Sequence, residues 1–269
     1  MQIVHRISFT ADEQLVARFK SHGVDINIGD NMRKVKESDK AWPLFKEVVK
    51  ERGRFGIVTT EFTKGEVKSA SLVEMATSRH QGYPQPEGDF GYLDQVYDTM
   101  QYCKSCGLGP LPQIDSFRFR GEPKWGKNEV LQLNWVYDEL FVTPQLYEQV
   151  FHPLGIENWQ VIHHKRDVHL ETVVQLRIPE VDVSFDMPEG FATETCTVCR
   201  KNKYQPWVRG FLPSLTAPVD LDIFKPSTIF GSGGKSFRSI LISSDLCSTL
   251  IERGARGLLM KPVKEFHNP

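Results

Sequence analysis

The sequence predicts an α+β fold, in which a mixed sheet region is flanked by helices. Two local patterns indicate it. Short runs that alternate apolar and polar residues are typical of half-buried strands, and Ser or Thr caps followed by spaced apolar residues are typical of helices. Both patterns recur along the 269 residues, a length that can bury a core without help from metal or disulfides.

Residues 1–85 are expected to form an N-terminal α/β lobe. Two capping boxes, Thr10 with Glu13 and Thr63 with Glu66, open its first and third helices, because each Thr can accept a backbone N–H while the acid returns the bond. The helices are expected from Thr10 to Gly23, from about Pro43 to Arg52 with Gly53 closing it, and from Thr63 through Leu72 to Met75. The strands are expected over residues 2–9, 24–28 and 55–60, with a charged loop over 30–40.

A stretch rich in Gly and Pro, residues 79–91, marks the expected boundary of this lobe. Residues 86–215 are expected to form a β-rich region, followed by a strand–helix–strand segment over 216–269, and these parts could also pack as one domain. Helices are expected from Thr143 to Phe151 and from Ser244 to Arg253. Strands are expected over residues 114–120, 130–135, 159–163, 172–178, 239–243 and 257–263.

Two C-x-x-C motifs lie far apart, with 89 residues between the second cysteine of one and the first of the other. Zinc prefers four tetrahedral ligands, and the x-x spacing lets a tight turn aim two sulfurs at one ion. The motifs therefore predict a structural Zn²⁺ site, a four-cysteine, zinc-ribbon-like clasp formed by two CxxC knuckles. Because protein ligands fill all four positions, no position is open for a substrate. The expected metal ligands are Cys103, Cys106, Cys196 and Cys199.

Local redox pairs, buried structural thiols or an iron–sulfur ligand set are the alternatives for these motifs. Gly107 follows the first motif, where the turn favours positive φ, whereas Arg200 takes the equivalent place in the second, so that turn must accept a side chain. Four thiolates around Zn²⁺ carry a formal charge of −2, which neighbouring basic residues could offset. The fifth cysteine, Cys247, is expected to be a core thiol.

Two other stretches invite a catalytic or ligand-binding role. His163, His164 and His169 could act as an acid–base or anion site, but a charged strand end and turn is the simpler interpretation. Residues 230–236 resemble a phosphate loop, yet the pattern needs glycine where Ile229 stands, so a flexible glycine turn is expected.

Neither an acid pair nor a short basic patch adds a clear site. Asp138 and Glu139 are adjacent carboxylates, which we expect to point to different sides and to remain solvated. The patch interleaves cations with aromatics and could contact nucleic acid, although charge compensation at the zinc site explains it equally well. The patch comprises Lys201, Lys203, Tyr204, Trp207 and Arg209.

The composition favours a cytoplasmic protein. The formal net charge is −1, so no overall field points to nucleic acid or to an acidic membrane. No run approaches the ~18 apolar residues that span a bilayer, and we expect no signal peptide at the N-terminus. Five cysteines, four of them in C-x-x-C pairs, indicate a reducing compartment rather than secretion.

From about residue 55 onward the chain resembles the bacterial double-CXXCG motif family, whose members are predicted immunity proteins of polymorphic toxin systems. The residues that carry the resemblance are 60–63, 103–107, 134–135, 138–139, 174–176, 196–199, 203–204 and 230–233, and residues 240–263 resemble the end of a related group of small immunity domains. The resemblance implies that the four cysteines bind metal and that the protein neutralises a toxin made by the same or a neighbouring cell. Arg200 departs from the family's glycine.

These observations predict a zinc-binding immunity protein that binds a cognate toxin protein stoichiometrically. Such a protein needs no catalytic residues, so we expect no enzymatic activity. One alternative is a zinc-ribbon nucleic-acid-binding adaptor. Another is an enzyme with its site near His163, His164 and His169.

Overall fold

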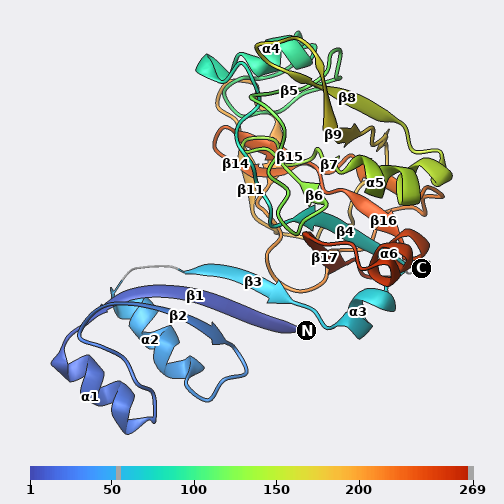
Figure 1. The fold of residues 1–269 in the computed structure, drawn as a ribbon. Coiled ribbons are helices and arrows are strands. Elements are labelled where there is room, and N and C mark those ends of the chain that lie inside the picture. The colour runs from blue at the N-terminus through green and yellow to red at the C-terminus, as the bar shows by residue number, and fades with distance from the viewer. Residues whose placement is uncertain (53–55, 266–269) are drawn as a thin grey trace. The chain divides into compact units, whose positions relative to one another are not determined.

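The structure, a computed structural model, describes residues 1–52 and 56–265 and confirms the α+β fold class (Figure 1). The chain forms two compact units. The first holds residues 1–66 together with 207–211, and the second holds residues 67–206 and the chain from residue 212 onward. The boundary expected after residue 85 falls inside the second unit, since a strand at residues 72–77 pairs there with two strands from the end of the chain.

The first unit is a three-stranded antiparallel sheet with two helices on one face. Strand β1 lies between β2 and β3. Phe9 of β1 packs against Phe19 of α1 and Phe45 of α2, which closes this face. The predicted helix end at Gly53 and strand start at residue 55 lie outside the described residues. The elements are β1 (Gln2–Ala11), α1 (Glu13–Ser21), β2 (Gly29–Lys36), α2 (Trp42–Arg52), β3 (Ile57–Glu61) and α3 (Lys64–Lys68), which leads into the second unit.

Two of the expectations for this unit were wrong. The N-cap of α1 is Asp12, whose carboxylate accepts a backbone N–H at 2.8 Å, whereas Thr10 lies in β1 and donates to Asp30 on the neighbouring strand. Residues 24–28 are irregular, and the loop expected over 30–40 contains most of β2. All eight residues of β2 pair with β1, so the neighbouring strand decides the conformation of this polar segment.

The capping box at α3 is confirmed, but the helix is much shorter than expected. The Thr63 hydroxyl accepts the Glu66 N–H at 3.2 Å, and the Glu66 carboxylate accepts the Thr63 N–H at 2.8 Å. The helix ends at Lys68, and Leu72 and Met75 belong instead to strand β4 (Leu72–Thr77). Alternate residues of β4 are buried, which is the period of a strand.

The described part of the second unit contains three sheets. One has the strand order β10-β13-β16-β4-β17, the second β5-β8-β9-β7-β6, and the third β11-β12-β14-β15. The strands of the first are β10 (Glu180–Val181), β13 (Ile223–Pro226), β16 (Leu241–Ser243), β4 and β17 (Leu258–Pro262). Those of the second are β5 (Arg118–Phe119), β6 (Val130–Leu131), β7 (Phe141–Val142), β8 (Asn158–His163) and β9 (His169–Leu176). Those of the third are β11 (Thr193–Thr195), β12 (Asn202–Tyr204), β14 (Phe230–Ser232) and β15 (Lys235–Phe237).

The helices of this unit begin close to their predicted caps. Thr143 caps α5 as expected, whereas α6 is capped by Ser243 and not by Ser244. Gly254, with φ +74°, ends α6, and Cys247 is buried within it, as expected of a core thiol. The helical segments are a 3₁₀ turn (Gly88–Phe90), α4 (Tyr92–Val96), α5 (Pro144–Leu146) with its π-helical (Tyr147–Phe151) and 3₁₀ (His152–Leu154) continuations, and α6 (Ser244–Arg253).

An aromatic core supports the second sheet. Phe117 packs edge to face against Tyr97 and Phe141, and Phe119 does the same against Phe141. Tyr97 lies between α4 and the first C-x-x-C motif, so this core helps to fix the start of the motif. None of the described helices is long and apolar enough to cross a lipid bilayer.

Candidate metal centre

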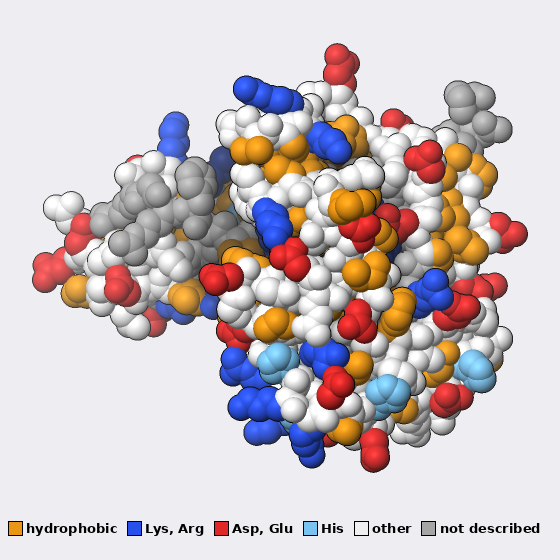
Figure 2. Space-filling view, turned by 90° about the horizontal axis from the view of Figure 1, so that it is seen from above, with side chains coloured by type: hydrophobic (Ala, Val, Ile, Leu, Met, Phe, Trp, Pro, Cys, Tyr) orange, Lys and Arg blue, Asp and Glu red, His pale blue; other side chains and the backbone are white. Residues whose placement is uncertain are grey.

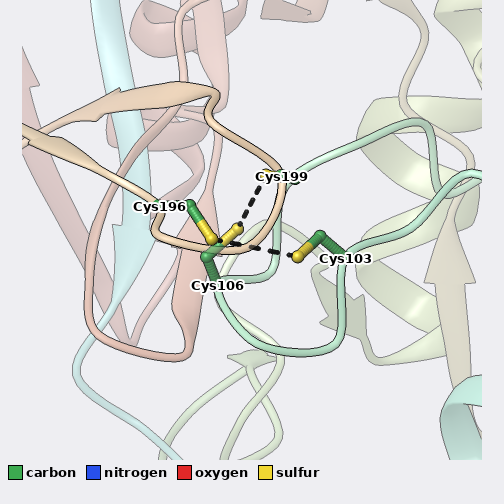
Figure 3. Close-up of side chains that lie close together, drawn as sticks. All are labelled: Cys103, Cys106, Cys196 and Cys199. Atoms are coloured by element: carbon green, nitrogen blue, oxygen red, sulfur yellow. Dashed lines mark hydrogen bonds between the residues drawn. The ribbon is translucent and has the colours of Figure 1, made fainter.

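The four cysteines of the two motifs converge on one point in the second unit, as Figure 3 shows. Their sulfurs all lie within 4.8 Å of one another, with 4.0 Å between Cys103 and Cys196 and 3.6 Å between Cys106 and Cys199. A tetrahedral Zn²⁺ with Zn–S bonds of about 2.3 Å separates its sulfurs by about 3.8 Å. A disulfide would need about 2.05 Å. The spacing therefore fits four thiolates around one ion.

The first knuckle is a tight turn closed by two backbone hydrogen bonds. The Cys103 N–H donates to the Leu108 carbonyl at 2.7 Å, and the Gly107 N–H donates to the Cys103 carbonyl at 2.8 Å. Gly107 has φ +77°, and a Cβ there would lie 3.0 Å from the Gly234 carbonyl oxygen. Both the backbone conformation and the close approach therefore favour glycine at this position.

The second knuckle repeats these two bonds at the equivalent positions. The Cys196 N–H donates to the Lys201 carbonyl and the Arg200 N–H to the Cys196 carbonyl, both at 3.0 Å. This turn joins β11 to β12, which pair as an antiparallel hairpin. Arg200 has φ +61°, the left-handed conformation of Gly107, so the second turn keeps the same shape and accepts a side chain at the cost of backbone strain.

The thiols of the cluster differ in acidity. Backbone amides, those of Cys199 and Val198, lower the pKa of Cys196 to about 6, and the Val198 nitrogen lies 3.4 Å from its sulfur. Burial raises the pKa of the Cys106 thiol to about 12. Metal ligation requires every one of these sulfurs to be deprotonated, so a bound cation has to displace the proton of the buried Cys106.

A buried lysine supports the backbone of the first knuckle through hydrogen bonds. Lys203 is 2 % exposed, and its ammonium donates to the carbonyls of Cys106 at 2.9 Å, of Lys235 at 3.0 Å and of Gly233. Three N–H donors thus meet three carbonyl acceptors. The Ser236 hydroxyl also donates to the Cys106 carbonyl, at 2.7 Å. The sequence suggested only charge compensation for Lys203, and its structural role was missed.

The segment that resembled a phosphate loop is the β14–β15 hairpin. Strands β14 and β15 pair antiparallel across Gly231 and Ser236. The Gly233 N–H donates to the Glu194 carboxylate at 3.0 Å. A backbone amide that a phosphate would need is therefore already hydrogen-bonded to a carboxylate. The segment is a glycine turn, as we expected, and it packs against the first knuckle.

The three histidines lie at the turn between β8 and β9. His163 is buried, and its Nδ1 faces the backbone N–H groups of Lys165 at 3.2 Å and Arg166 at 3.3 Å. Asp167 has φ +55° in the same turn. This is the charged strand end and turn expected from the sequence. The Nδ1 of His164 is buried without a hydrogen-bond partner in the described part of the chain.

The solvated acid pair expected at residues 138 and 139 was wrong for Glu139. Its side chain is buried and forms an ion pair with Lys225, which is buried too. A signal was present in the sequence, because Lys225 stands alone within the apolar run of β13. Without the fold, nothing identified its partner.

Comparison of the chain with protein-family models, with curated proteins and with solved structures found no match in any of the three. The case for a metal centre therefore rests on the convergence of the four sulfurs and on the two equivalent turns that present them.

Cys196→Ser is expected to abolish metal binding and to destabilise the second unit, because a hydroxyl is a poor substitute for a thiolate and three sulfurs leave the site incomplete. Elemental analysis of purified protein should find about one zinc per chain in the wild type and almost none in the variant. Cys247→Ser, which alters a buried thiol outside the cluster, is the matched control and should keep the metal. Full zinc retention by Cys196→Ser would contradict a four-sulfur site.

Arg200→Gly is expected to raise the free energy of unfolding by about 1 kcal/mol, because glycine adopts positive φ without the steric conflict of a Cβ. Urea denaturation of the zinc-loaded protein measures the change. Lys201→Gly, at the next position, introduces the same residue where φ is not positive, and it should lower stability. A loss of stability in Arg200→Gly would mean that the arginine side chain contributes more than its backbone conformation costs.

Lys203→Met is expected to lower the free energy of unfolding by about 3 kcal/mol, since three buried carbonyls lose their donor. The exposed neighbour gives the control: Lys201→Met should change stability by less than about 0.5 kcal/mol. Denaturation curves of both variants with zinc present measure the two changes in the free energy of unfolding. Equal stability of Lys203→Met and wild type would show that the ammonium does not support the knuckle.

Proposed function

We propose that this protein is a zinc-binding immunity protein of the double-CXXCG type, which neutralises a cognate bacterial toxin in the cytoplasm by stoichiometric binding. The observation that carries the proposal is that the two C-x-x-C motifs present their sulfurs to one point. The resemblance from which the immunity role comes includes the same two motifs, and it implies a shared metal site.

A metal clasp suits a protein whose task is to hold a surface in shape. Joining Cys106 to Cys196 closes a loop with 89 residues in between, and the free energy of metal binding then contributes to folding. A rigid scaffold loses less conformational entropy when a partner binds. We expect the interface with the toxin to be rich in acidic or aromatic side chains, which favour fast association and well-packed contacts.

The nucleic-acid adaptor has less support. Of the basic residues in its patch, Lys203 is buried under the first knuckle and Arg209 pairs with Glu37 at 2.7 Å in the first unit. Acidic and basic side chains are interspersed over much of the face drawn in Figure 2, although Lys and Arg side chains gather near its lower-left edge. The burial of Lys203 and the pairing of Arg209 remove two cations from the patch that the sequence suggested, so that patch is not a continuous basic surface of the kind that tracks phosphates.

The enzyme near the histidines also has less support. The Nδ1 of His163 faces two backbone amides of its own turn, so the imidazole is already used to shape that turn. A general base needs a free nitrogen that a substrate proton can reach, and the Nδ1 of His164, which has no partner among the described residues, is buried. We therefore retain stoichiometric binding as the proposed function.

Co-expression with the product of the open reading frame directly upstream, as the candidate toxin, tests the proposal. Production of that toxin alone should kill a bacterial host, the wild-type chain should restore growth, and the two proteins should co-purify in a 1:1 complex. Cys196→Ser should lose protection because the clasp is lost, whereas the matched Cys247→Ser should protect. Failure of the wild-type chain to bind or protect, or substrate turnover by the pure protein that a cleft variant abolishes, would overturn the proposal.

A further inference from the structure

A buried ion pair lines two cavities in the second unit. Lys225 comes from β13 and Glu139 from the segment before β7. Their side chains are 5 % and 10 % exposed, and the Lys225 ammonium contacts Glu139 Oε1. Although burial opposes it, the Glu139 carboxylate holds the pKa of Lys225 above its usual value, so the ammonium stays charged.

An amide network fixes the carboxylate in place. Glu139 Oε2 accepts the Gln175 Nε2–H at 2.9 Å. Gln175 and Gln113 exchange side-chain hydrogen bonds at 2.7 and 2.9 Å, and Gln113 also donates to the Asp115 carbonyl at 2.9 Å. Both carboxylate oxygens and both amides therefore have partners. The polar wall is rigid, as a preorganised binding site requires.

The Lys225 ammonium and the Tyr97 hydroxyl, which lie near this amide network, have hydrogen-bond donors that no described residue accepts. An ammonium has three N–H donors, and Glu139 is the one hydrogen-bond partner of Lys225 Nζ among the described residues. The Tyr97 hydroxyl also makes no hydrogen bond within the described residues, but it is not among the fully buried atoms that lack a partner. An unpaired buried donor costs about 1–3 kcal/mol, so the spare N–H groups of Lys225 call for a partner from outside the chain.

Both groups line the same cavities. The larger has a volume of about 370 Å³, within the size range of small-molecule sites, and the smaller has about 70 Å³. The larger cavity is also lined by the apolar side chains of Leu111 and Ile178 and by Trp159. It thus combines an apolar wall with a few convergent polar groups.

We propose that the larger cavity binds a small uncharged organic molecule whose carbonyl or hydroxyl oxygen accepts hydrogen bonds from Lys225 and Tyr97, with its apolar part against Leu111 and Trp159. An anion is disfavoured because Glu139 already neutralises Lys225, and because Glu157 pairs with Arg177, the other cation of the lining. A second carboxylate, Glu180, also lines the same cavity. This site is separate from toxin binding and does not depend on the immunity role.

Stability alone gives little reason for such a pair. Exchange of a buried ion pair for apolar residues of similar volume is often neutral or stabilising, because desolvation offsets the attraction. A pair that lines a cavity of this size, with donors to spare, is better explained by a ligand that completes its hydrogen bonds.

The lactam 2-pyrrolidinone, an uncharged probe with one carbonyl, tests the site in the full zinc-loaded chain. In a ¹H–¹⁵N NMR titration it should shift the signals of Gln113, Gln175 and Lys225 saturably, and acetate should not. Leu111→Trp fills the cavity without touching the ion pair and should weaken binding at least tenfold. Ile114→Trp adds the same bulk at an exposed position nearby and should leave binding unchanged.

A second variant removes the donor. Lys225→Met combined with Glu139→Gln leaves no unpaired buried charge, and it should also weaken pyrrolidinone binding at least tenfold. The proposal is overturned if the wild type shows no saturable shift or if Leu111→Trp binds like the wild type. It is also overturned if a crystal soaked with a saturating concentration of the probe contains only water in the cavity.

Discussion

The structure of the second unit depends on four sulfurs being held within a few ångströms of one another. Like charges at that distance repel, and burial opposes ionisation of the Cys106 thiol, so the arrangement needs a cation to be stable as four thiolates. The surroundings are built to support it. Two equivalent turns present the sulfurs. The ammonium of the buried Lys203 donates hydrogen bonds to one carbonyl of the first turn and to two carbonyls of the β14–β15 hairpin, so it joins the hairpin to that turn.

This constraint explains why segments so far apart in sequence form one body. The first motif follows the aromatic core near Tyr97, and the second closes the β11–β12 hairpin. Strand β12 in turn pairs with β14, so the cluster joins the core of one sheet to the edge of another. A protein that acts by presenting a fixed surface benefits from such a joint, since preorganisation reduces the entropic cost of binding.

The sequence predicted the parts of the fold that local chemistry decides. Helix caps at Thr63 and Thr143, the glycine end of α6 and the four-cysteine cluster all follow from residue types at short spacing. The sequence did not predict the elements whose conformation depends on a partner far away in the chain. Strand β2 is polar and forms because β1 pairs with it, and the expected helix at Met75 is a strand flanked by β16 and β17. The Glu139–Lys225 pair could not be predicted because its members are 86 residues apart.

X-ray absorption spectroscopy at the zinc edge of the purified protein tests the central claim most directly. A single shell of four sulfurs at about 2.3 Å is the result that a four-thiolate zinc clasp predicts. A shell containing nitrogen or oxygen ligands, or protein that carries no metal and has its cysteines as disulfides, would contradict the clasp and with it the account of how the second unit is held together.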